Sequence, residues 1–282
     1  MHPLNLVKFA NIQPWQELSE RTYREPICAK LAAEYTSRLV SMHAMTMIPG
    51  FSFMIGDNWG ECVAAAMGEL KTTDSERTDV AELASQKLQK LITTRPSNES
   101  IRKYWESTRN IEILIAGSRY QHSAHHELFQ AVVTKAWSAI EILLKDLWHS
   151  VTPLRLEFQA VINSVPKEER ARTFTFLNLP KTRKTYLLTF KSDPRRIDEA
   201  LKDNALDALS LLRHLIVHAG GKLDKTFMDR SNGNALLKSI RAAGRHSEAE
   251  FTGEVIRPII DRSAARGYEV LTAVDNWLFF NS

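Results

Sequence analysis

The feature that most constrains the fold is the segment 127–148, where apolar side chains recur every three or four positions. This spacing aligns them along one side of an α-helix and leaves the opposite side polar. The polar edge includes Glu141 and Lys145, whose spacing supports an ion pair within a helix. The apolar positions are Leu128, Phe129, Val132, Val133, Ala136, Trp137, Ile140, Leu143, Leu144, Leu147 and Trp148. The pattern predicts a long amphipathic helix whose apolar face needs other elements to cover it.

Helical periodicity recurs along the chain and strand signals are scarce, so we expect an all-α fold. Beyond 127–148, helices are expected at about 152–164, 198–217 and 247–280, with Pro258 as a kink or an internal start. The expected helix at 198–217, the third in the chain order that starts with 127–148, stops before Gly220 and Gly221, because glycine accepts the positive φ of a helix end.

The N-terminal part is interpreted as shorter helices separated by loops. Expected helices cover about 15–46, 58–70, 74–92 and 99–116, with breaks at 48–51 and 93–100. We therefore expect an N-terminal helical region over residues 1–120 and a second helical domain over residues 121–282.

Composition excludes several classes of protein. Of 282 residues, 44% are apolar and 25% are charged, which is typical of a globular chain and not of a disordered one. The longest uncharged stretch, 39–56, is interrupted by Pro49 and Gly50, so no membrane span is expected. The N-terminus shows no secretory signal, and two cysteines argue against a disulfide framework. We therefore expect a cytoplasmic protein without membrane partners.

The net charge of +4 lies entirely in residues 127–282, and the segment 167–196 holds nine basic and three acidic residues. Such a local excess is typical of a surface that binds a polyanion. Tyr186 and Phe190 lie among these cations, and they either stack on bases or, the favoured alternative, anchor the core. The cations expected to contact an RNA backbone are Lys181, Arg183, Lys184, Arg195 and Arg196.

A candidate catalytic pair closes the third expected helix, where the sequence 211–221 reads LLRHLIVHAGG. Arg213 and His218 lie five residues apart, about 140° around an ideal α-helix, so their side chains diverge. They converge on one substrate only if the last turn loosens or if a second copy of the chain contributes. Five pairs in the chain share an Arg-x4–6-His spacing, and only this one combines a polar second residue, an apolar helix before it and a double glycine after it.

This segment, together with the helix that contains Ala136-Trp-Ser-Ala-Ile-Glu-Ile-Leu-Leu-Lys-Asp-Leu, resembles the HEPN superfamily over about residues 125–280. The resemblance implies an up-down four-helix bundle that forms a homodimer and cleaves RNA without a metal or other cofactor. It implies that Arg213 holds the scissile phosphate and that His218 transfers protons. His214 is then an assisting residue. Glu141, which lies on the first helix, positions the motif Arg or His.

The family association further implies a toxin or an anti-phage defence effector that cleaves tRNA, mRNA or rRNA, with an antitoxin or sensor as a possible partner. Two alternatives stay open at this point. One is an inactive HEPN domain that binds RNA or nucleotide or serves in dimerisation. The other is a helical scaffold in which Arg213 and His214 only complement the helix dipole.

A second histidine group precedes the helix of 127–148. His122, His125 and His126 have a spacing compatible with a metal site, but no Cys joins them and Glu127 is the only local carboxylate. We therefore interpret them as part of a solvated loop, and we expect no metal site.

Overall fold

The computed structural model describes residues 15, 17–18, 20–70, 77–93, 119–191, 194–242, 244–245 and 247–280. Over these residues the chain is all-α, as expected, and it contains no strand; a single isolated bridge joins Lys222 and Glu248.

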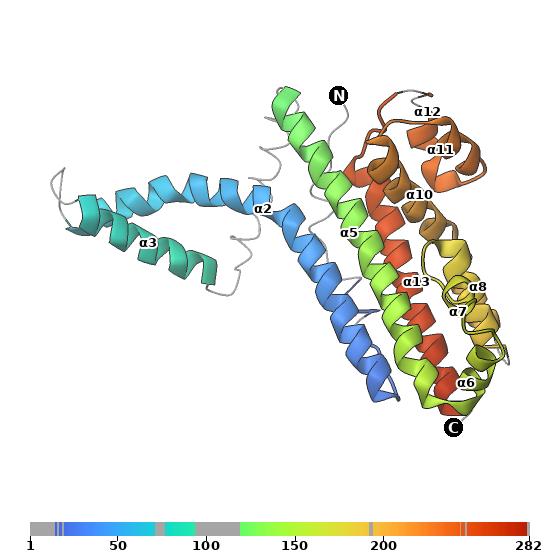
Figure 1. Cartoon of the computed structure of the whole chain (residues 1–282). Coiled ribbons are helices and arrows are strands. Elements are labelled where there is room, and N and C mark those ends of the chain that lie inside the picture. The colour runs from blue at the N-terminus through green and yellow to red at the C-terminus, as the bar shows by residue number, and fades with distance from the viewer. Residues whose placement is uncertain are drawn as a thin grey trace.

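The architecture is organised around one helix, α13 (Gly253–Phe280). It contacts α2 (Pro26–Leu70), α5 (Arg119–Val151), α9 (Arg195–Leu201) and α10 (Asn204–Ala219), and α5 in turn contacts α2 and α10 (Figure 1). Its buried side chains lie along nearly its whole length, from Ile256 to Leu278. The helix is therefore the central element against which the others pack.

The first half of α2 is held against α13 by one close approach and one buried carboxylate. A Cβ at Gly267 would lie 2.6 Å from the hydroxyl oxygen of Tyr35, so only glycine permits this approach. The buried Asp275 accepts hydrogen bonds from the backbone N–H groups of Arg24 and Glu25, just before α2 begins. Burial, aided by Asp275, raises the pKa of the Cys28 thiol to about 12, so this cysteine is no nucleophile at neutral pH.

The core is continuous across residue 120. Trp15, Tyr35 and Leu39 belong to the same buried cluster as Trp137 and Leu271. Residues on both sides of the expected domain boundary thus share one core. Among the described residues, no helix combines the length and apolar character that a membrane span needs.

The expected break at 48–51 is wrong, because α2 continues through Pro49 and Gly50 to Leu70. Figure 1 shows instead that α2 changes direction, so that its second half and α3 (Arg77–Thr93) extend away from the other helices. Proline removes one helical hydrogen bond and is a usual cause of a bend within a helix that continues beyond it. The extension has a small cluster of its own, formed by Cys62, Ala66 and Ala84.

Short helices cover the side of α5 and α13 opposite to α2. They are η2 (Thr152–Leu154), α6 (Leu156–Asn163), α7 (Arg170–Thr173), α8 (Leu179–Thr189), α11 (Lys225–Arg230), η3 (Ala235–Leu237) and α12 (Lys238–Ala242).

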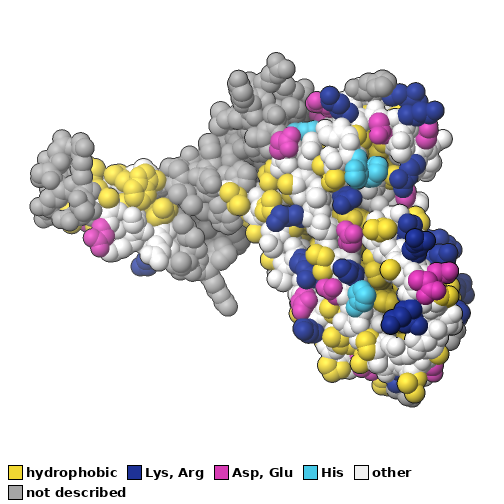
Figure 2. All heavy atoms as spheres, in the orientation of Figure 1, with side chains coloured by type: hydrophobic (Ala, Val, Ile, Leu, Met, Phe, Trp, Pro, Cys, Tyr) yellow, Lys and Arg dark blue, Asp and Glu magenta, His cyan; other side chains and the backbone are white. Residues whose placement is uncertain are grey.

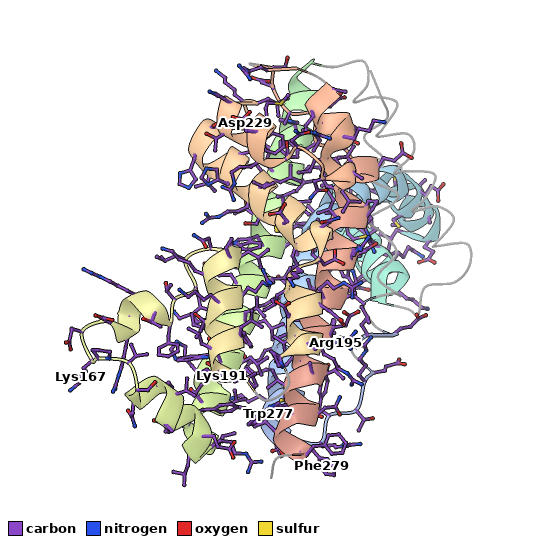
Figure 3. The ribbon with its side chains drawn as sticks, turned by 90° about the vertical axis from the view of Figure 1, so that its right-hand side faces the viewer. Lys167, Lys191, Arg195, Asp229, Trp277 and Phe279 are labelled. Atoms are coloured by element: carbon purple, nitrogen blue, oxygen red, sulfur yellow. The ribbon has the colours of Figure 1, made fainter. Side chains whose placement is uncertain are left out.

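Aromatic side chains attach this layer to α5 and α13. Tyr186 donates a hydrogen bond of 2.7 Å to the carbonyl oxygen of Leu144, and the Trp148 indole donates one of 2.9 Å to Thr189. Trp277, near the lower end of α13 in Figure 3, contacts the rings of Phe158 and Phe190.

Most expected helices are present, with altered boundaries. The amphipathic pattern of 127–148 lies within α5, and the expected helix at 74–92 corresponds to α3. The expected helix at 198–217 is wrong in extent, because α9 ends at Leu201 and α10 begins separately at Asn204. The expected helix at 99–116 lies outside the described residues.

The close approach at Gly267 yields a stability prediction. We expect Gly267→Ala to lower the free energy of unfolding by about 1–3 kcal/mol, because the new methyl group overlaps Tyr35 in a packed interface. Chemical denaturation measures this change. The matched control is Gly68→Ala in α2, where the added methyl meets open space and better helix propensity adds up to about 1 kcal/mol. Equal effects of the two substitutions would contradict the interpretation.

Candidate active site

The helix that carries the candidate residues, α10, is fixed at its start by Asp203. This side chain accepts a hydrogen bond of 2.8 Å from the backbone N–H of Ala205, which caps the helix. The same carboxylate pairs with Arg262 and Arg266 of α13. The start of α10 is thereby tied to the central helix, and Leu209, Leu212 and Leu215 bury its inner face.

The end of α10 is fixed by two glycines. Gly220 has φ of +59°, and its N–H donates to the carbonyl of Ile216, while the N–H of Gly221 donates to that of Leu215. The bond from Gly220, a residue in the left-handed conformation, to the carbonyl four residues earlier is the αL motif of a helix end. Because α10 stays α-helical through Ala219, its last turn is not loosened.

Arg213 and His218 lie on the two edges of the exposed face of α10. Arg213 is half-buried and His218 is exposed, and Val217 between them is 50% exposed. The regular helix keeps them about 140° apart. Figure 2 shows histidine side chains at the surface over α10, with Lys or Arg side chains close to them.

His214 and His218 form a pair on this face. Their ring centroids are 4.5 Å apart with an interplanar angle of 42°. Partial burial lowers the pKa of His214, and the nearby positive charges of His218, Arg230 and Arg213 lower it further, whereas Asp224 opposes them. A lowered pKa favours the neutral imidazole at pH 7, which is the form that accepts a proton.

Arg213 is available to an anionic ligand. Within the described part of the chain its guanidinium has no ion-pair partner. Glu141, the residue expected to position it, forms no hydrogen bond or ion pair with Arg213, His214 or His218 in this same part of the chain. The expected ion pair between Glu141 and Lys145 is likewise not formed there.

The structure adds two residues that sequence reasoning missed, both from α11. Asp224 caps this helix by accepting a 2.7 Å hydrogen bond from the N–H of Phe227, and Arg230 lies in its last turn. Both act electrostatically on His214. The available signal was Asp224 itself, a typical N-cap residue placed soon after the double glycine.

Two of the expected RNA-binding cations are already ion-paired. Arg183 pairs with Asp198 at 2.5 Å, and Arg195 pairs with Glu199 at 3.1 Å. The hydrogen bond from Arg183 lowers the pKa of Asp198. Within the described residues, the candidates without an ion-pair partner are Lys181, Lys184 and Arg196.

The basic stretch is also dispersed in space. Figure 3 shows Lys167, Lys191 and Arg195 well separated across one side of the molecule. The end of α9 leads directly into the start of α10 at Asn204, whereas His218 lies in the last turn of α10, about 20 Å away along the helix axis. The cations of α8 and α9 are therefore remote from the histidine pair.

The aromatic residues of the basic stretch belong to the core, the alternative that the sequence favoured. Tyr186 and Phe190 are fully buried, so stacking on bases is wrong for both. Phe174 and Phe176 pack against Trp148, with ring centroids 5.5 and 5.8 Å from it.

The histidines at 122–126 are not in a loop, because α5 begins at Arg119. His126 donates from Nε2 to the carbonyl oxygen of Ala249 at 2.6 Å, and its Nδ1 accepts from the Gln130 amide at 3.1 Å. Both ring nitrogens are engaged, so His126 joins α5 to the segment before α13. The side chains of His122 and His125 lie outside the described residues.

Two surface grooves follow α2, and Arg213, His214 and His218 line neither of them. One, of about 670 Å³, runs from Arg21 to Val40, and the other, of about 380 Å³, lies between α2 and α5.

Comparison of this chain with protein-family models, curated proteins and solved structures gives no match.

The environment of His214 predicts its titration. We expect its pKa to lie below the usual 6.5, so protonation disfavours the folded state and the free energy of unfolding falls as the pH drops below about 6.5. Arg230→Gln should raise this pKa, and Asp224→Asn, which preserves the helix cap, should lower it. NMR titration of the imidazole resonances, assigned with His214→Gln, measures both shifts. Identical titration curves in all variants would contradict the described arrangement.

Proposed function

We propose that the protein is a metal-independent endoribonuclease of the HEPN type, which cleaves RNA through attack of its own 2′-hydroxyl. The observation that supports this most is that Arg213, which has no ion-pair partner among the described residues, lies on the same exposed helix end as the His214–His218 pair. The guanidinium of Arg213 can bind two phosphate oxygens, and imidazoles are the side chains that transfer protons near neutral pH.

The chemistry needs no further group. A neutral imidazole removes the 2′-hydroxyl proton, and the 2′-oxygen attacks the adjacent phosphorus. The bond from phosphorus to the 5′-oxygen breaks, and a protonated imidazole donates a proton to that oxygen. The products are a 2′,3′-cyclic phosphate and a 5′-hydroxyl. In this proposal His218 carries the proton transfers, His214 assists it, and Arg213 stabilises the developing negative charge.

A homodimer is part of the proposal. Because Arg213 and His218 lie on opposite edges of a regular helix, the α10 helices of two copies complete each site best when Arg213 of one copy faces His218 of the other. The HEPN-like four-helix bundle, an RNA-targeting toxin or defence role in the cytoplasm, and an antitoxin or sensor partner belong to the same proposal.

The first test is RNA cleavage in EDTA. We expect the wild type to leave 2′,3′-cyclic phosphate ends and to arrest growth on expression. Arg213→Ala and His218→Ala should each lower the cleavage rate by about 10²–10⁴-fold while the protein stays folded. Wild-type protein that binds RNA without cutting it would favour the inactive binding module.

A mixing experiment separates a shared site from a site within one chain. Arg213→Ala and His218→Ala proteins, unfolded and refolded together, form dimers in which one site has both wild-type residues. We expect recovery of up to about a quarter of wild-type activity, because half of randomly formed dimers are mixed and each has one complete site. No recovery, with mixed dimers verified, would contradict the shared site.

Lys184 and Arg196, which have no ion-pair partner among the described residues, yield a binding prediction. We expect Lys184→Glu with Arg196→Glu to weaken RNA binding and to flatten its dependence on salt concentration, since phosphate contacts release counterions. Arg183→Gln is the matched control, because the guanidinium of Arg183 is already ion-paired with Asp198. Filter binding of a catalytically inactive variant over a salt series measures both effects. An unchanged affinity and salt slope in the double variant would remove this surface from the RNA interface.

A further inference from the structure

The groove of about 380 Å³ between α2 and α5 is distinct from the α10 site. Four of its residues come from one face of α2 and four from one face of α5, where the two helices lie side by side (Figure 1). The lining residues are Ser37, Arg38, Ser41, Met42, Lys135, Ser138, Ala139 and Ile142. The volume is within the range of small-molecule sites in proteins.

The polar lining of this groove is made only of groups that can donate hydrogen bonds. It contains two cations, Arg38 and Lys135, and three serine hydroxyls, and its lining includes no carboxylate. Within the described residues, the hydroxyls of Ser37 and Ser41 have no hydrogen-bond partner. The Ser138 hydroxyl donates to the carbonyl of Thr134 in its own helix.

Both cations are available to a ligand. Lys135 is exposed and has no ion-pair partner in the described part of the chain. Arg38 approaches Glu34 at only 3.9 Å, and Glu34 is shared with Lys30 at 4.0 Å. An exposed pair of this length contributes little, so it does not prevent Arg38 from binding an anion.

The remaining surface of the groove is apolar. Met42 and Ala139 are buried, and Ile142 is 37% exposed. A ligand that fits this lining has an anionic end between Arg38 and Lys135 and an uncharged body against the side chain of Ile142.

We propose that this groove binds a small phosphate monoester with an uncharged body, in the size class of a mononucleotide. A terminal phosphate carries close to two negative charges at neutral pH, which matches two cations without a carboxylate better than the single charge of a phosphodiester. The guanidinium of Arg38 holds two phosphate oxygens, Lys135 supplies the second positive charge, and the hydroxyls of Ser37 and Ser41 donate to the remaining oxygen.

Isothermal titration calorimetry on the full chain tests this proposal with adenosine monophosphate as the probe. We expect saturable binding that Arg38→Gln and Lys135→Gln each weaken about tenfold or more, because each removes a charge-assisted hydrogen bond. Lys145→Gln, an exposed cation of α5 outside the groove, is the matched control and should leave the affinity unchanged. Thermal unfolding verifies that all three variants are folded.

Three comparison probes make the proposal falsifiable. Adenosine should bind much more weakly, and inorganic phosphate should bind more weakly than the nucleotide. A dinucleoside monophosphate, which has only a phosphodiester, should also bind more weakly; equal affinity would assign the groove to RNA and overturn the proposal. Absence of saturable nucleotide binding, or binding that both groove variants retain, would overturn it as well. None of these results depends on Arg213 or His218, so the proposed ribonuclease activity stands or fails separately.

Discussion

The burial of α13 between α2, α5, α9 and α10 is the constraint on which the rest of the structure depends. Two features of α13 determine how α2 meets it. Gly267 admits Tyr35 at a distance that no side chain allows, and Asp275 satisfies backbone N–H groups at the start of α2. A buried carboxylate is costly without such partners, so the start of α2 and the lower half of α13 stabilise each other. The position of α2 beside α5 then follows, and with it the groove between them.

The sequence predicted the elements whose signals are local. The amphipathic pattern within α5 and the glycine stop of α10 need only the residues that form them, and both are present. The extent of α2 was not predictable in this way. Pro49 and Gly50 favour a break, but the structure retains the helix and bends it. Likewise, Asp203 separates α9 from α10 because it caps one helix and pairs with two arginines of α13, and such partners are invisible in a linear sequence.

Charge counting along the sequence does not show which cations are already ion-paired or which aromatic residues are buried. The basic excess in 167–196 contains Arg183, whose charge is matched by Asp198, a residue outside that segment. Its aromatic residues are buried, because α8 needs Tyr186 and Phe190 to attach to α5 and α13. Conversely, Arg230 contributes to the environment of His214 although it belongs to a later helix, and no spacing rule connects the two.

The candidate site and the groove differ in what each needs to be complete. In the groove, one chain supplies both cations and the hydroxyls, from helices that the core holds in register. In the α10 site, the regular helix separates Arg213 from His218 by about 140°, and the hydrogen bonds of Gly220 and Gly221 to Ile216 and Leu215 hold the last turn in place. The same glycines that fix His218 therefore prevent a single copy from bringing the pair together by unwinding. If the site is catalytic, RNA cleavage then depends on the assembly of two copies, since the regular helix of one copy keeps Arg213 about 140° from His218.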